Sequence, residues 1–189
     1  MTPEEIKQFI IGGKWESIAP EVRPSIIKDA NGNMKPFYCT RLFRYSAGGL
    51  FELTFINYAD ASGKTPLVKM EIKGHIIFED KHPIAEGAYQ LNYIADVGFD
   101  VTPLHQGFVD AVNQLPAAGL NKWEMNVSQN VKGKTFPVFG LKQGELYQEF
   151  DLIYIYNDML FNGSRNVDGR GFDKPENRPT NLQIPLARK

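Results

Sequence analysis

One stretch of the sequence restricts the fold more than any other, because residues 67–79 alternate between two kinds of side chain. One set is almost wholly apolar: Val68, Met70, Ile72, Gly74, Ile76 and Phe78. The other set is mostly polar: Leu67, Lys69, Glu71, Lys73, His75, Ile77 and Glu79. A period of two with one apolar face predicts a half-buried antiparallel strand. Its length suits the wall of a β-barrel.

Several other segments carry strand patterns, and few carry helical ones. Further strands are expected at residues 14–18, 37–46, 50–58, 88–97, 122–127, 144–156, 159–162 and 182–187. A short helix is expected at the N-terminus, with Thr2 as its cap, Pro3 in its first position and Glu5 completing a capping box. A second helix is expected at residues 102–115, with Thr102 as cap and Pro103 in its first position.

Short turns join the expected strands without a strand–helix–strand alternation, which disfavours a parallel α/β sheet. The sequence therefore predicts a mainly β fold, an antiparallel up-and-down barrel of about eight strands with a short N-terminal helix and one inserted helix near 102–115. Closing the sheet into a barrel removes its exposed edges. We expect one domain, residues 1–189, in which residues 163–189 form a loop-rich C-terminal extension.

Charge and targeting signals narrow the class of protein. Lys and Arg together number 21 and Asp and Glu number 22, so the formal net charge is −1. That balance gives no electrostatic reason to expect nucleic acid or a membrane as a partner, although a local basic patch stays open. The chain begins with acidic residues and lacks an apolar run of about 18–20 residues, as a spanning helix needs. We therefore expect a cytoplasmic protein.

Motifs for metal ions and nucleophiles are missing from the sequence. The histidines His75, His82 and His105 show no metal-ligand spacing, and Cys39 is the single cysteine. We expect neither a metal nor a cofactor, while a composite metal site from distant residues stays open. Cys39 shares a strand face with aromatic residues, which favours a small buried side chain over a catalytic thiol.

A charged residue interrupts the apolar face of the strand at 37–46. Arg41 shares that face with Phe37, Cys39, Phe43 and Tyr45, so we expect it to point into the barrel. A buried guanidinium needs partners: it either pairs with a carboxylate in the core or anchors an anionic or carbonyl head of a ligand. We expect a small, largely apolar ligand to contact Arg41, Tyr45, Phe55, Asn57, Met70, Tyr93 and Tyr154.

The triplet Gly13-Lys14-Trp15, between the short helix and the first strand, resembles the Gly-x-Trp motif that opens lipocalins and related calycins. The resemblance implies a calycin-like barrel that binds a small apolar molecule, although some calycin-like barrels are enzymes. It also implies that Trp15 closes one end of the barrel under an arginine that follows the last strand. Arg165, after the strand at 159–162, takes that place in the sequence.

Two other functions stay open. A metal-independent barrel enzyme, an isomerase, cyclase or lyase, would use Arg41 with a tyrosine and one of Asp96, Asp100 or His105 as its acid–base group. A structural or interaction protein would use its Arg-rich tail or an exposed strand edge, and a homodimer stays open as well. The mixed-charge segment 165–178 forms either an ion-paired loop or a lid over one end of the barrel.

Overall fold

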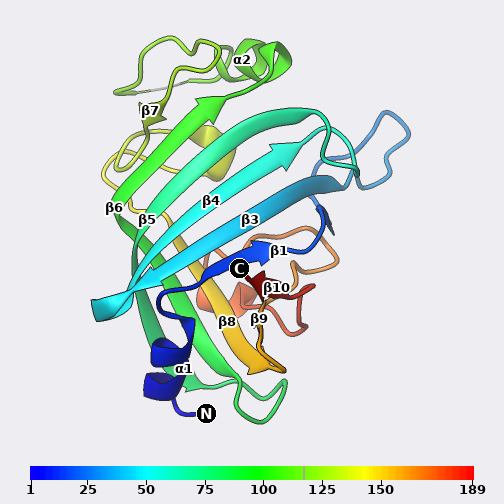
Figure 1. The fold of residues 1–189 in the computed structure, drawn as a ribbon. Helices are drawn as coiled ribbons and strands as arrows, with labels where there is room; N and C mark the ends of the chain where they lie inside the picture. The colour runs from blue at the N-terminus through cyan, green and yellow to red at the C-terminus, as the bar shows by residue number, and fades with distance from the viewer. Residues whose placement is uncertain (117) are drawn as a thin grey trace.

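The computed structural model describes residues 1–116 and 118–189, and most of its regular structure is strand (Figure 1). The two α-helices are α1 (Pro3–Ile10) and α2 (Gln106–Val112), and single 3-10 turns lie at Ala47–Gly49, Pro137–Phe139 and Pro175–Asn177. The strands are β1 (Lys14–Ser17), β2 (Glu21–Arg23), β3 (Phe37–Ser46), β4 (Leu50–Tyr58), β5 (Pro66–Lys81), β6 (Tyr89–Pro103), β7 (Gln129–Asn130), β8 (Gln148–Tyr156), β9 (Met159–Asn162) and β10 (Leu186–Arg188).

Eight of the described strands close into an antiparallel barrel, which confirms the predicted fold class. Around the ring the strands run β3, β4, β5, β6, β8, β9, β10 and β1, and β1 pairs with β3 to close it. The closing strand has Trp15 opposite Phe43 on one side and opposite Arg188 on the other. The short strands β2 and β7 pair outside this ring, with β3 and β6 respectively.

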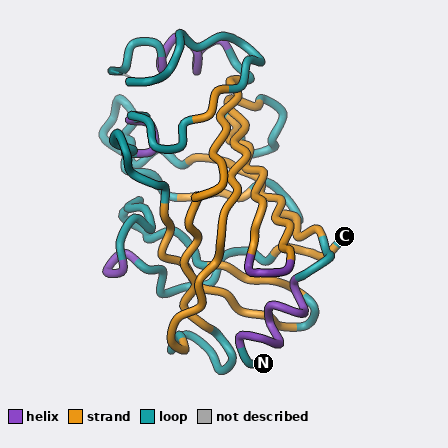
Figure 2. Tube along the Cα trace, turned by 90° about the vertical axis from the view of Figure 1, so that its left-hand side faces the viewer, coloured by secondary structure: helices purple, strands orange, loops and turns teal. Residues whose placement is uncertain are grey.

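Helix α1 lies across one end of the barrel, and α2 lies at the opposite end (Figures 1 and 2). The predicted capping box of α1 is present: the Thr2 hydroxyl accepts from the Glu5 N–H at 3.3 Å, and the Glu5 carboxylate accepts from the Thr2 N–H at 2.6 Å. Ile6 and Ile10 are buried against the core. Neither described α-helix has the length and hydropathy to cross a bilayer.

Aromatic side chains fill the part of the barrel nearest α1. Phe43 and Tyr45 of β3 stack at 5.6 Å between ring centroids, and Phe51 of β4 meets Tyr93 of β6 edge-on at 5.0 Å. Cross-strand register brings these rings together, since Phe51 lies directly opposite Tyr45. The alternation read from the sequence therefore places the core on the expected face of β3 and β4.

The predicted inserted helix begins later than expected. Thr102 and Pro103 continue β6, because Thr102 pairs with Lys69 of β5. The cap of α2 is instead His105, whose Nδ1 accepts from the Gly107 N–H at 3.1 Å. Pairing with a long neighbouring strand thus overrides a local helix-start signal.

Four other segments differ from the prediction. Residues 122–127 are not a strand: the Trp123 N–H donates instead to the Asn113 side chain at 2.8 Å, away from any sheet. The strands expected at 144–156 and 182–187 are β8 and β10, which begin at Gln148 and Leu186. Strand β2 was not predicted, because prolines flank it on both sides.

Candidate functional site

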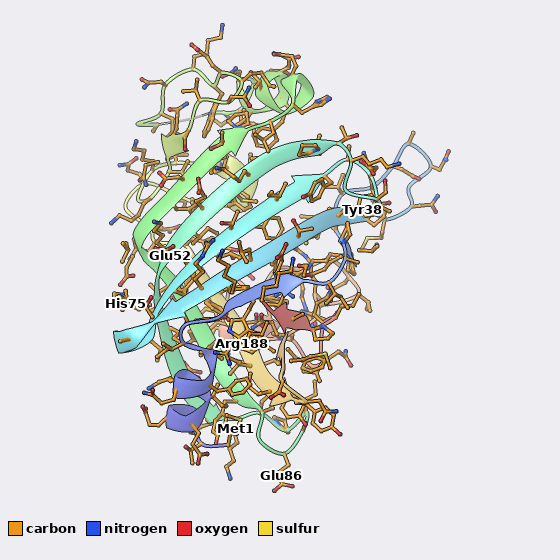
Figure 3. The ribbon with its side chains drawn as sticks, viewed as in Figure 1. Met1, Tyr38, Glu52, His75, Glu86 and Arg188 are labelled. Carbon is orange, nitrogen blue, oxygen red and sulfur yellow. The ribbon has the colours of Figure 1, made fainter. Side chains whose placement is uncertain are left out.

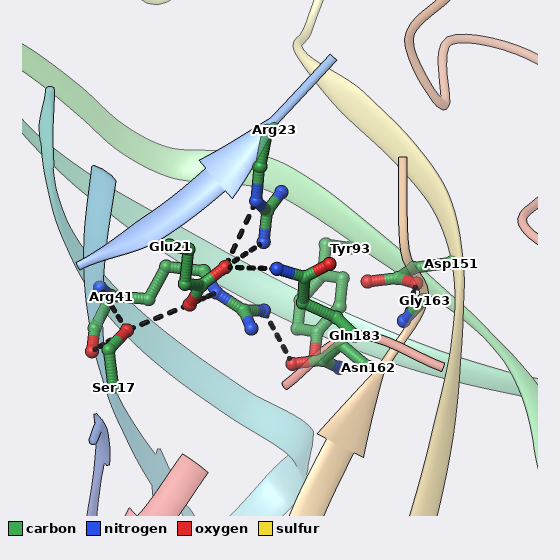
Figure 4. A network of polar contacts seen from close by, with 9 residues as sticks. All are labelled: Ser17, Glu21, Arg23, Arg41, Tyr93, Asp151, Asn162, Gly163 and Gln183. Carbon is green, nitrogen blue, oxygen red and sulfur yellow. Dashed lines mark hydrogen bonds and ion pairs between the residues drawn. The ribbon is translucent and has the colours of Figure 1, made fainter. Parts of the chain in front are cut away.

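Arg41 points into the barrel and is 4% exposed. Its Nε donates to Glu21 Oε1 at 2.8 Å, and its Nη1 donates to Asn162 Oδ1 at 3.0 Å (Figure 4). The two partners come from β2 and β9, on either side of the closing strands. The expected pairing of a buried guanidinium with a core carboxylate is therefore present.

Glu21 is shared by two guanidinium groups. Arg23 donates to Glu21 Oε2 from Nε at 3.0 Å and from Nη2 at 2.7 Å, and the Gln183 amide donates to the same oxygen at 3.1 Å. Burial disfavours the charged form of Glu21, but the charges of Arg41 and Arg23 outweigh burial and lower its pKa to about 2. Two cations and one anion leave this cluster with an excess of positive charge.

One nitrogen of Arg41 has no partner. Nη2 is buried and makes no hydrogen bond within the part of the chain that the structure describes. An unmade hydrogen bond at a buried charged donor costs about 1–3 kcal/mol or more. Since Nε and Nη1 are both held, the direction of the Nη2 donor is set by Glu21 and Asn162.

A chain of buried hydrogen bonds continues from Arg41 across the barrel. Asn162 Nδ2 donates to the Tyr93 hydroxyl at 3.1 Å, and the Tyr93 and Tyr45 hydroxyls lie 2.8 Å apart. Burial raises the pKa of both tyrosines, so both hydroxyls keep their protons at neutral pH. The chain links Arg41 to the end of the barrel that α1 covers.

A buried carboxyl group lies on β8, the strand that pairs with β9 and its Asn162. Asp151 of β8 is 4% exposed, and its Oδ1 accepts from the Leu152 N–H at 2.7 Å and the Gly163 N–H at 2.8 Å. Burial, together with the charge of Glu149, raises the pKa of Asp151 from 3.8 to about 7. A group with this pKa can hold or release a proton near neutral pH.

The residues predicted to line the ligand site are only partly gathered. Phe55 of β4 lies directly opposite Arg41, and Met70 of β5 lies opposite Phe55, so all three share the inner face. Asn57 is half-buried on the same face, and its amide donates to the Tyr38 carbonyl at 2.8 Å. Tyr45 and Tyr93 join Arg41 through the hydrogen-bonded chain.

Tyr154 lies apart from the other predicted ligand residues. It alternates with Asp151 and Ile153 on β8, so its ring is on the other face of that strand. There it stacks on Tyr156 at 6.1 Å and contacts Phe161 at 6.0 Å between ring centroids. The strand was expected, but the inward position given to Tyr154 is wrong, because the inner face of β8 carries Asp151 and Ile153 instead.

The acid–base groups suggested for an enzyme do not meet Arg41. Asp96 lies 2.8 Å from the His75 Nδ1, and both side chains are more than a third exposed; His75 lies at the outer edge of the molecule (Figure 3). Asp100 accepts from the Asn130 amide at 2.9 Å, and His105 caps α2. Each of these three side chains thus has a partner of its own, and none of those partners is Arg41.

The arginine over Trp15 is Arg188 and not Arg165. The Arg188 guanidinium lies 5.5 Å from the indole ring and 5.6 Å from the Phe9 ring, and it donates to the Ile11 carbonyl at 3.3 Å. Arg165 lies instead over the Phe37 ring at 5.2 Å. The last wall strand is β10 rather than β9, so the arginine of the closure comes from the end of β10.

Two of the pockets on the described surface lie beside the two α-helices. One, of about 480 Å³, lies between α1 and the β3–β4 turn and is lined in part by Lys7, Tyr45 and Ile76. The other, of about 320 Å³, lies beside α2 and Trp123. Tyr45 is the predicted ligand residue that lines the first pocket, and its hydroxyl begins the hydrogen-bonded chain to Arg41.

Sequence reasoning found Arg41 but missed Glu21, Asn162 and Asp151. Asp151 gave no comparable signal, because Glu149 precedes it on the same face of β8, whereas Arg41 has Cys39 and Phe43 on either side in β3. Burial raises the pKa of Cys39 to about 11, so it remains a thiol at neutral pH. No cluster of three or more metal-ligating side chains occurs within residues 1–116 and 118–189. No protein-family model matches the sequence.

Proposed function

We propose that the barrel binds a small, largely apolar molecule whose anionic or carbonyl head accepts a hydrogen bond from Arg41 Nη2. The observation that carries this proposal is the unpartnered, buried Nη2, in an otherwise well-satisfied cluster. Buried polar groups in proteins are nearly always hydrogen-bonded, so an unmade bond at a charged donor favours a missing acceptor.

The charge around Arg41 favours an acidic head. Arg23 and Arg41 share one carboxylate, so an added anion would neutralise the excess positive charge. Glu21 and Asn162 hold the guanidinium before the ligand arrives, and this preorganisation reduces the entropy lost on binding. A guanidinium group also donates well to a carboxylate or a sulfonate, because each of these groups presents two or more acceptor oxygens close together.

The apolar part of the ligand would lie along the inner face of β4 and β5. Phe55 and Met70 adjoin Arg41 in register, and Phe55 and Asn57 are only half-buried, whereas Phe51 and Leu53 nearer α1 are buried. Phe55 and Asn57 are therefore the more accessible residues of this wall, while Met70 beside them is 3% exposed. Apolar walls with a few placed polar groups are typical of small-molecule sites.

Two fluorescent probes with the same aromatic body test the proposal: anilinonaphthalene sulfonate, which is anionic, and N-phenylnaphthylamine, which is neutral. We expect the sulfonate to bind about tenfold more tightly, as a charge-assisted hydrogen bond in a buried site allows. Arg41→Lys keeps the charge beside Glu21 but removes the forked donor, and should abolish the preference. Arg44→Lys, on the same strand with its side chain on the opposite face, should leave it unchanged.

Equal binding of the two probes, or an equal effect of Arg41→Lys and Arg44→Lys, would contradict the proposal. Thermal melting of each variant checks that Arg41→Lys remains folded. Mass spectrometry of molecules that co-purify with the native protein would then identify the physiological ligand class, and we expect an amphipathic acid.

A second candidate, a metal-independent barrel enzyme, is favoured by Asp151, whose pKa of about 7 suits a general acid or base. Mass spectrometry separates it from the binding protein. An enzyme would retain product in the native protein and unreacted substrate in Asp151→Asn. A binding protein would retain the same molecule in both.

A further inference from the structure

Exposed aliphatic side chains gather on the loops at one end of the barrel. The loop between β2 and β3 projects from the right-hand side of Figure 1, and the loop after β9 lies below it. Ile26 is 70% exposed, Ile27 is 64% exposed, and Val167 on the second loop is 88% exposed. We call Val22, Ile26, Ile27, Met34 and Val167 the aliphatic tip. Large aliphatic residues grouped on protruding loops mark a contact with another apolar phase or partner.

The two loops of the aliphatic tip are packed against each other. A Cβ atom added to Gly169 would lie 2.3 Å from the Ser25 carbonyl carbon and 2.6 Å from the Ile26 nitrogen, so the backbones of the two loops touch. Arg165 lies over the Phe37 ring at 5.2 Å and so joins the same loops at their base. Val167, two residues before Gly169, therefore lies on a loop whose backbone touches the loop of Ile26 and Ile27.

Backbone hydrogen bonds hold the isoleucines in an exposed position. The loop forms a small hairpin, in which the Lys35 N–H donates to the Ile27 carbonyl at 2.8 Å and Lys28 pairs with Met34. The Ser25 hydroxyl accepts from the Ile27 N–H at 2.9 Å. The hairpin is built without burying the side chains of Ile26 and Ile27, so their exposure belongs to an ordered structure.

Two lysines share the first loop with the isoleucines of the aliphatic tip, and the exposed pair Asp168 and Arg170 follows Val167 on the second loop. The loop of residues 24–36 carries Lys28 and Lys35, both exposed, against the single acidic residue Asp29. Asp29 is engaged by its own loop, since its carboxylate accepts from the Asn31 and Asn33 N–H groups at 2.9 Å each. The chain as a whole has a net charge of −1, so this positive end is a local feature.

We propose that the aliphatic tip docks on a membrane surface that contains anionic phospholipids. The isoleucines would enter the boundary between headgroups and acyl chains, and Lys28 and Lys35 would contact the phosphates. A projecting pair of aliphatic residues between lysines fits a soft, anionic surface, whereas stable protein partners bury broad and well-packed patches. The overall net charge of −1 gives no attraction to an anionic membrane, whereas Lys28 and Lys35 provide such an attraction locally. The inference does not depend on the ligand of Arg41.

Flotation with vesicles tests the inference. We expect the protein to bind vesicles of phosphatidylcholine mixed with phosphatidylserine about tenfold more strongly than vesicles of phosphatidylcholine alone. The double variant Ile26→Ser/Ile27→Ser should lose about tenfold or more of this binding. The matched control Ile77→Ser/Val97→Ser removes two exposed aliphatic residues from β5 and β6, 47% and 52% exposed, and should bind like the native protein. Lys28→Glu/Lys35→Glu should remove the preference for phosphatidylserine.

Three results would overturn the inference. The native protein might leave both kinds of vesicle unbound, or the tip and control variants might lose binding equally. Alternatively, light scattering would reveal a dimer that Ile26→Ser/Ile27→Ser dissociates while vesicle binding is absent, which would assign the tip to a second copy of the chain. Thermal melting should show both double variants folded, because none of the four side chains is buried.

Discussion

Replacing Asp151 with asparagine should stabilise the protein above neutral pH, because the native carboxyl group must ionise inside the barrel. Its pKa rises from 3.8 to about 7 on folding, first through burial and then through the charge of Glu149. The folded protein therefore holds this proton more tightly than the unfolded chain does. Ionising the buried Asp151 carboxyl group lowers the free energy of unfolding. This loss of stability is absent below pH 3.8, grows as pH rises and is complete above about pH 7.

The magnitude follows from the size of that shift. A difference of about three pKa units, at about 1.4 kcal/mol each, corresponds to about 4 kcal/mol above pH 7. Asparagine keeps the oxygen that accepts from the Leu152 and Gly163 N–H groups, and it has no charge to bury. We expect Asp151→Asn to raise the free energy of unfolding by about 2–4 kcal/mol at pH 8, and by less than about 1 kcal/mol at pH 4.

Urea denaturation followed by circular dichroism, repeated between pH 4 and pH 8, measures this difference directly. Asp168→Asn is the control, since this aspartate is exposed and its contact with Arg170 at 3.6 Å adds about 0–1 kcal/mol. The same stability difference for Asp151→Asn at pH 4 and pH 8 would refute the reasoning, because a change in packing has no pH dependence.

Three further substitutions probe other parts of the structure. Glu21→Gln should reduce the free energy of unfolding by about 3–5 kcal/mol at pH 7, and it should remove the native protein's loss of stability as pH falls from 4.5 towards about 2. Arg188→Ala should cost about 1–2 kcal/mol in urea denaturation, through the lost contact with the Trp15 indole. Gly74→Ala should lower the melting temperature sharply, because its Cβ would lie 1.8 Å from a carbonyl oxygen of β6; Gly98→Ala, with nothing within 4 Å, should not.

Local signals in the sequence predicted the parts of the fold that form locally. The capping box of α1 and the β3–β4 hairpin need only neighbouring residues, and both match the structure. The two predicted strands 144–156 and 159–162 leave only residues 157 and 158 between them, and Asn157 and Asp158 form a turn there, with φ values of 47° and 58°. The start of α2 was misplaced because it depends on how far β6 pairs with β5, a contact between distant segments.

In the candidate site, too, local sequence signals predicted individual positions but not contacts between distant segments. Alternation along β3 placed Arg41 inside the barrel, but its partners Glu21 and Asn162 lie 20 and 121 residues away in the sequence. Nothing near Arg41 in the sequence identifies them. The arginine over Trp15 was assigned to Arg165 because β9 was taken as the last wall strand, whereas the short β10 lies beyond a long irregular segment.

The closing strands β1 and β10 have a consequence for biosynthesis. Residues 14–17 are translated well before their neighbours at 186–188, because the rest of the barrel lies between them in the sequence. Until then, one side of β1 and one side of β9 have no strand to pair with, and unpaired edges invite association with other nascent chains. We therefore expect barrel closure to follow the synthesis of β10 and to be the slow step of folding.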